Sequence, residues 1–165
     1  MMNKTKKIVT LALLTAVSLV LFTVEAQLPA IPMIPYVKIG IANIITLFIL
    51  HRNGFRFYDA IMVMTARVLI ASLVTGNLFS LFFSFSGGMA ALLVMLLFRR
   101  VFRNGLIWAT SVSGAIAHIS TQVLIAVLIY GGTGIFLYIP LLVFCSIISG
   151  LLTGFVTAII LKRVF

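Results

Sequence analysis

The sequence predicts an all-α integral membrane protein, built as one bundle of six membrane-spanning helices over residues 1–165. Three observations predict this class. Hydrophobic residues make up 63% of the chain, charged residues make up only 8%, and the charges lie in short clusters between long apolar runs. Soluble domains carry about a quarter charged residues, so an ordinary soluble domain and a disordered chain are excluded. The single cysteine, Cys145, leaves no intrachain disulfide, and the length leaves no room for a separate soluble catalytic domain.

Each predicted span is an apolar run that approaches the roughly 20 residues a helix needs to cross a bilayer. The second run is short and follows three prolines, which fix an extended backbone and prevent an earlier helix start. Gly76 and Asn77 divide one long apolar stretch into the third and fourth runs, and the turn Gly131–Gly134 separates the last two. The six predicted spans are residues 8–28, 36–50, 57–75, 78–98, 106–130 and 135–161.

The charges test this topology independently of the apolar runs. Ten of the twelve cations precede the first span, follow the last one or separate spans two from three and four from five, whereas the opposite connections carry none. Under the positive-inside rule this face and both termini are cytoplasmic, so the sequence predicts a multi-pass protein of the cytoplasmic membrane. The net charge of +10 reflects this topology rather than a nucleic-acid surface. The ten cations are Lys4, Lys6, Lys7, Arg52, Arg56, Arg99, Arg100, Arg103, Lys162 and Arg163.

A cleavable signal peptide is an alternative reading of the N-terminal segment. Three lysines, an apolar run and Val24-Glu25-Ala26 loosely imitate one. The run is long for such a segment, however, and cleavage would leave five spans with termini on opposite sides. We therefore expect the first run to remain as a span.

Small and polar residues within the runs predict how the helices meet. Gly87-Gly88 and the pair Gly150 and Gly154 allow close backbone approach, so we expect tight helix packing there, with homodimerisation as the less favoured alternative. Asn77 is expected to cap the outer end of the third span.

A few costly polar groups fall inside the predicted membrane. A charge at membrane depth costs about 2.5–3.5 kcal/mol, so it needs a partner, water or a ligand. Arg67 is expected roughly 15 Å from the start of its span, and His118 roughly 18 Å from the start of the fifth. Asp59 lies at the end of the third span, where Arg56 is expected to neutralise it. The candidate ligand-binding residues lie from the midplane outward and are Lys38, Asn43, Arg67, His118, Gln122 and Glu25.

Two interpretations of this set remain. Glu25 could neutralise Arg67 or Lys38, with His118 and Gln122 as polar contacts between helices. The set could instead line a pocket open to the outside. The sum of Lys38, Arg67 and Glu25 is +1, which favours an anionic ligand, and Arg binds a carboxylate or phosphate through paired hydrogen bonds.

Several absences argue against an enzyme. No G-x-x-x-x-G-K-[ST] motif is present, so the chain does not bind ATP in that way. A prenyltransferase that holds Mg²⁺ between clustered aspartates needs more than the single Asp59. His51 and His118 lack a third ligand for zinc. We therefore expect no catalytic residues, no metal site and no cofactor.

Several stretches resemble the membrane family labelled heptaprenyl diphosphate synthase component I, also called the Gx transporter family. The most specific is Val37-Lys38-Ile39-Gly40-Ile41-Ala42-Asn43, and the resemblance covers nearly the whole chain. Two positions depart from the family pattern: Tyr36 stands where Gly is usual, and Ile119 where Asn is common. The other stretches are Ala66-Arg67-Val68-Leu69, Ser86-Gly87-Gly88 and Ser111-Val112-Ser113-Gly114 with His118 and Gln122.

The resemblance implies an architecture and partners. That family looks like the substrate-binding (S) components of energy-coupling factor (ECF) transporters, six-helix proteins that dock to a transmembrane T component driven by two ATPases. Docking uses an Ala-x-x-x-Ala face on the first helix, which Ala12 and Ala16 match. The family label also implies a connection with isoprenoids or quinones, and relatives are linked to extracellular electron transfer.

The sequence thus predicts a membrane-embedded S subunit of an ECF-type uptake transporter for a small anionic or amphiphilic compound. The alternative is a non-catalytic membrane partner of a prenyl diphosphate synthase or of a quinone-linked, extracellular electron-transfer assembly. A purely structural assembly subunit is a third possibility.

Overall fold

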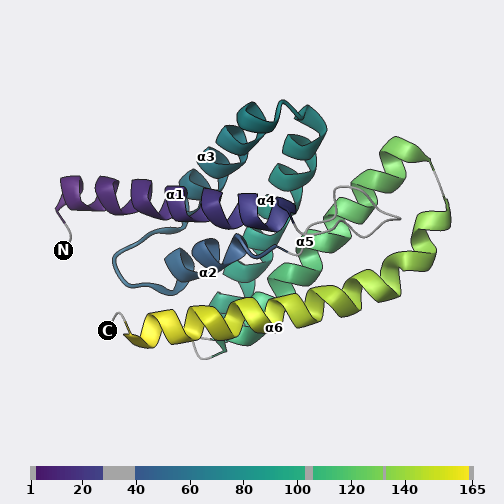
Figure 1. Cartoon of the computed structure of the whole chain (residues 1–165). Helices are drawn as coiled ribbons and strands as arrows, with labels where there is room; N and C mark the ends of the chain where they lie inside the picture. The colour runs from purple at the N-terminus through teal and green to yellow at the C-terminus, as the bar shows by residue number, and fades with distance from the viewer. Residues whose placement is uncertain (1–2, 28–39, 103–105, 132, 164–165) are drawn as a thin grey trace.

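The computed structural model describes residues 3–27, 40–102, 106–131 and 133–163, and over these residues the fold is all-helical (Figure 1). Five helices are long and apolar enough to cross a membrane. The long apolar runs therefore form helices, as predicted, and the chain is a multi-pass membrane protein. The elements are α1 (Lys4–Gln27), α2 (Asn43–His51), α3 (Phe57–Thr75), α4 (Leu78–Val101), α5 (Ile107–Tyr130), the 3₁₀ helix η1 (Thr133–Tyr138) and α6 (Ile139–Arg163).

The second predicted span needs a correction. Where 36–50 was expected to be helical, α2 has only nine residues and begins at Asn43. Nine residues rise about 14 Å, roughly half of a bilayer core, so α2 is too short to cross by itself. The physical reason is local, because Gly40 adopts a φ of 87°, a left-handed conformation that interrupts a helix.

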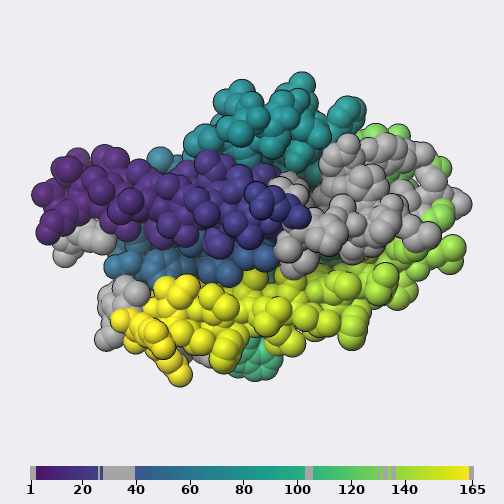
Figure 2. Space-filling view, in the orientation of Figure 1, coloured from purple at the N-terminus to yellow at the C-terminus, as the bar shows by residue number. Residues whose placement is uncertain are grey.

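The helices form a bundle around α2. Helix α5 packs against both α4 and α6, α3 packs against α1 and α4, and α2 contacts α1, α3, α4 and α6. In the space-filling view only a narrow band of α2 remains visible between α1 and α6 (Figure 2). All residues of α2 from Asn43 to Leu50 are buried. The short helix therefore fills the middle of the bundle along roughly half of the thickness of a bilayer core.

Apolar side chains are distributed as a membrane protein requires. The largest core cluster joins α2 residues Phe48 and Ile49 to Val63 and Leu92 of the neighbouring helices. Many other large apolar side chains face outward from the long helices; Leu73 of α3, for example, is 82% exposed. Such a surface is tolerated when lipid tails, rather than water, cover it.

The turn between α3 and α4 shows the residue preferences that predicted it. Gly76 ends α3 with a φ of 63°, and the Asn77 side chain accepts a hydrogen bond of 3.0 Å from the Ser80 backbone N–H. Asn77 is therefore the N-cap of α4, not a cap of the third span as expected. The reason is that an Asn side chain satisfies the unpaired N–H groups at the start of a helix.

Helices α5 and α6 meet at glycines. A Cβ atom on Gly150 would lie 2.6 Å from Val112 Cα, and one on Gly154 would lie 2.7 Å from Trp108 Cα. Beside them the hydroxyls of Ser111 and Thr153 are hydrogen bonded at 2.7 Å. The prediction that this glycine pair serves helix packing is confirmed, because the contact it allows lies within the chain.

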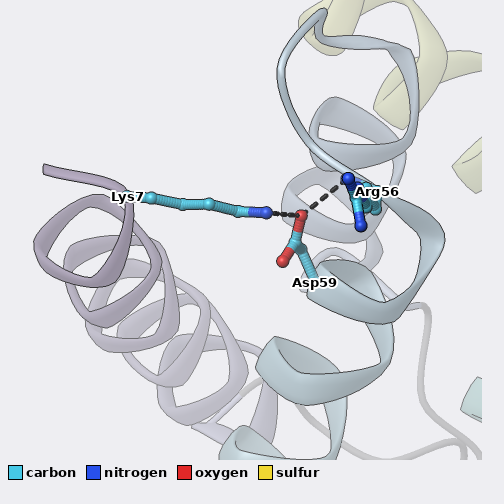
Figure 3. A network of polar contacts seen from close by, with 3 residues as sticks. All are labelled: Lys7, Arg56 and Asp59. Carbon is cyan, nitrogen blue, oxygen red and sulfur yellow. Dashed lines mark hydrogen bonds and ion pairs between the residues drawn. The ribbon is translucent and has the colours of Figure 1, made fainter. Parts of the chain in front are cut away.

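All described cations except Arg67 gather at one end of the bundle, which we call the charged end: the start of α1, the loop between α2 and α3, the end of α4 and the end of α6. Figure 1 places the start of α1 and the end of α6 on this side. The ends of α1 and α3 are joined there by an ion pair of 2.7 Å between Lys7 Nζ and Asp59 Oδ2 (Figure 3). The cations of the charged end are Lys4, Lys6, Lys7, Arg52, Arg56, Arg99, Arg100, Lys162 and Arg163.

The partner of Asp59 differs from the expected one. The carboxylate also accepts a hydrogen bond of 2.6 Å from the backbone N–H of Arg56, at the start of α3. Arg56 thus engages Asp59 through its main chain, while Lys7 supplies the opposite charge. Sequence proximity favoured Arg56, but the packing of α1 on α3 brings Lys7 within reach.

Candidate ligand-binding site

The most unusual buried side chain is that of Arg67, in the middle of α3. It is only 3% exposed and lies ten residues from the start of the helix, roughly 15 Å along its axis. Its guanidinium carbon lies 6.0 Å from the centre of the Phe22 ring of α1. Its Nε atom makes no hydrogen bond among the described residues. A guanidinium is always charged and donates through five N–H groups, and the one on Nε has no acceptor in the described chain.

The buried carboxylate of Glu25 on α1 attracts the guanidinium of Arg67 electrostatically. Its carboxylate is not devoted to Arg67, because Oε1 also accepts a hydrogen bond from the backbone N–H of Gly40. One carboxylate therefore serves two elements, the guanidinium of α3 and the turn that precedes α2.

The start of α2 is fixed beside this pair. Asn43 is buried, and a Cβ atom on Gly40 would lie 3.0 Å from Asn43 Nδ2. The backbone N–H of Asn43 bonds to the Gly40 carbonyl at 2.9 Å, and the Ser18 hydroxyl of α1 lies 3.5 Å from the Ala42 carbonyl. Helix α1 therefore holds the start of α2 through Ser18 and Glu25, and brings Asn43 into the neighbourhood of Arg67.

A second polar group lies where α4 meets α5. His118 and Gln122 are one turn apart on α5, and both are buried. A Cβ atom on Gly87 of α4 would lie 3.1 Å from Gln122 Cγ and from two ring atoms of His118. The missing side chain at Gly87 thus lets both residues lie directly on the α4 backbone.

Gln122 has no exposed surface, and neither its Oε1 nor its Nε2 atom has a hydrogen-bond partner among the described residues. A buried amide without partners costs about 1–3 kcal/mol by protein mutational data. Polar contact between helices was one interpretation of Gln122, but no described residue makes such a contact with its amide. The amide is therefore available to a ligand or to water.

The structure brings the predicted residues into two groups rather than one. Glu25, Asn43 and Arg67 lie together where α1, α2 and α3 meet, and His118 and Gln122 lie together on Gly87. Helix α4 packs against both α3 and α5, and its next residue, Gly88, faces Met64 one turn before Arg67. Lys38 lies outside the described residues.

Sequence reasoning missed two neighbours of the first group, Phe22 and Gly40. An aromatic ring three residues before Glu25 on α1 was the available signal for Phe22, because residues i and i+3 share a helix face. Over the part of the chain that the structure describes, no three His, Cys, Asp or Glu side chains gather as metal ligands.

Ala12 and Ala16 lie apart from both groups. They are exposed on α1, on the same stretch as the exposed side chains of Leu13 and Val17. This part of α1 leaves an apolar surface uncovered by the rest of the described chain.

A comparison with family models gave one finding. The model described as heptaprenyl diphosphate synthase component I matches residues 14–160. No curated protein and no solved structure matches the chain. The match extends over most of the sequence, and the chain therefore belongs to this family, as the resemblance of its motifs implied.

Proposed function

We propose that this member of the heptaprenyl diphosphate synthase component I family is a non-catalytic binding subunit of the cytoplasmic membrane, which captures a small anionic or amphiphilic compound for ATP-driven uptake. Arg67 is the observation that carries the proposal. A guanidinium at this depth costs about 2.5–3.5 kcal/mol to insert, and a protein retains such a group when it serves a ligand or an ion path.

The surroundings of Arg67 favour a ligand over a closed ion pair. Glu25 divides its carboxylate between Arg67 and the Gly40 N–H, and Arg67 Nε remains without a hydrogen bond in the described chain. A carboxylate or phosphate would supply an acceptor for the Nε–H of Arg67. Lys38, Asn43, His118 and Gln122 complete the proposed set of contacts.

Energy for uptake would come from partners, since the chain has no ATP-binding loop of its own. By its resemblance to ECF S components, the protein would dock to a T component that two ATPases drive. Ala12 and Ala16 support this part of the proposal, because they are exposed on an apolar face of α1 that small side chains would let another helix approach closely. The bilayer is the other partner, and no nucleic acid is involved.

The alternative function rests on the family's description. A heptaprenyl diphosphate synthase component would be a membrane partner of a soluble prenyl diphosphate synthase, or of a quinone-linked or extracellular electron-transfer assembly. The exposed cations of the charged end, Arg100 among them, would then face that partner.

Affinity purification of the tagged full-length chain from its own membranes, followed by mass spectrometry, separates these functions. The proposal expects a T component and two ATPases, and expects Ala12→Leu and Ala16→Leu to abolish their recovery. Val74→Leu, which also enlarges a lipid-exposed side chain, is the control and should change nothing. Recovery of a soluble synthase instead would establish the alternative, and recovery of neither would leave a purely structural subunit.

A further inference from the structure

The orphaned amide of Gln122 specifies more about the ligand than its charge. The side chain is 0% exposed, and both polar atoms lack partners in the described part of the chain. An amide presents an acceptor and two donors side by side. A single ligand group that satisfies both ends of this amide must therefore offer a donor and an acceptor side by side.

Gly87 defines where this amide is held. Because a Cβ atom there would lie 3.1 Å from Gln122 Cγ, the stem of Gln122 rests against α4 without room for a side chain between them. The stem is thus fixed by packing while the amide end stays unmatched. A group held in place by its supporting contacts is suited to reading a ligand, because less freedom is lost on binding.

The chemistry of common groups narrows the choice. A carboxylate or phosphate offers acceptors alone and would leave Gln122 Oε1 without a donor. A hydrocarbon would satisfy neither atom. A lactam, an imide or a primary carboxamide places an N–H beside a C=O, and pairs with both ends of the Gln122 amide at once.

The acidic group of the ligand belongs elsewhere. Arg67 lies on α3 and Gln122 on α5, and α4 packs between these helices. An acid matches the guanidinium of Arg67 and an amide-type edge matches Gln122, so one ligand that reaches both residues carries both groups. From these observations we propose that the ligand is an acid that also carries an amide-type edge, with Arg67 binding the acid and Gln122 reading the edge. This inference rests on the proposed anion-binding function and adds the substrate class.

Matched pairs of probes test this inference on the purified full-length protein by titration calorimetry. Orotate and pterin-6-carboxylate carry an acid and an amide-type edge, whereas benzoate and 2-naphthoate carry the acid on rings of similar size. We expect each edge-bearing acid to bind at least about tenfold more tightly than its partner, since two further hydrogen bonds form to groups that are otherwise unpaired. Gln122→Met should reduce this ratio to less than about twofold. Arg67→Gln should weaken all four acids at least about tenfold.

Gln27→Met is the matched control, because it makes the same chemical change at an exposed position of α1. Equal binding within each pair, still dependent on Arg67, would overturn this inference and leave the anion site standing. A wild-type protein that binds none of the four acids would overturn both. A preference that survives Gln122→Met would assign the edge to another residue and also overturn the inference.

Discussion

Replacing Gln122 by Met should stabilise the ligand-free protein. The amide is fully buried without hydrogen bonds among the described residues, and such a group costs about 1–3 kcal/mol. Methionine has a similar shape and volume and carries no amide, so it fills the same space beside Gly87 without opening a cavity. We therefore expect the free energy of unfolding of ligand-free Gln122→Met to rise by about 1–3 kcal/mol.

The assay is reversible unfolding of the purified protein by SDS titration in mixed micelles, followed by circular dichroism. Gln27→Met, at an exposed position, should lie within about 0.5 kcal/mol of the wild type. If Gln122 were instead a structural contact between helices, its loss would cost about 0.6–2 kcal/mol, as such hydrogen bonds do in membranes. A less stable Gln122→Met protein would therefore refute the reasoning that this amide is reserved for a ligand.

Three further predictions concern the scaffold. Gly150→Ala should lower the free energy of unfolding by about 1–3 kcal/mol in the same assay, because its Cβ would lie 2.6 Å from the backbone of α5. Gly134→Ala is the control and should have little effect, because its Cβ would meet nothing within 4 Å. Equal effects would contradict the close contact of α5 and α6. Asp59→Ala should lower the free energy of unfolding by about 1–2 kcal/mol, and by more than Lys7→Met does, because it removes both the hydrogen bond at the start of α3 and the ion pair. A larger loss of stability for Lys7→Met would refute that order. Burial lowers the pKa of His51, the last residue of α2, below 6.5, so the unfolded chain binds the proton more readily and the free energy of unfolding falls as the pH drops below about 6.5. His51→Gln should flatten this pH profile of unfolding. An unchanged profile would exclude His51 as its cause.

Most of the fold followed from apolar length and turn chemistry. Helix α3 has the predicted bounds of residues 57–75, because an apolar run ends at Gly76, whose φ of 63° only glycine adopts readily. The prediction of the second span was wrong, because α2 begins only at Asn43. Hydropathy is averaged over a window of residues and does not detect a left-handed turn such as the one at Gly40. The start of the last span also differs, because η1 precedes α6 and Pro140 lies in the first turn of α6. A proline suits that position, so it was a usable signal for this boundary.

The burial of the described candidate residues and their depth along the helices were predictable, but their grouping was not. Residue counting placed Arg67 and His118 at similar distances from the charged end. Which side chains meet depends on how each helix is rotated about its axis, and adjacent residues point about 100° apart. Gly87 and Gly88 illustrate this, because one faces α5 and the other faces Met64 of α3. Pairing of this kind arises from the packing of the whole bundle.

Native mass spectrometry of the full-length protein, released from its own membranes in gentle detergent, tests the binding of a small acid by Arg67 most directly. The wild type and Arg100→Gln, which removes an exposed cation, should each retain one organic acid per chain, and Arg67→Gln should retain none. A wild-type protein without a bound small molecule, or equal retention by Arg67→Gln, would contradict the account.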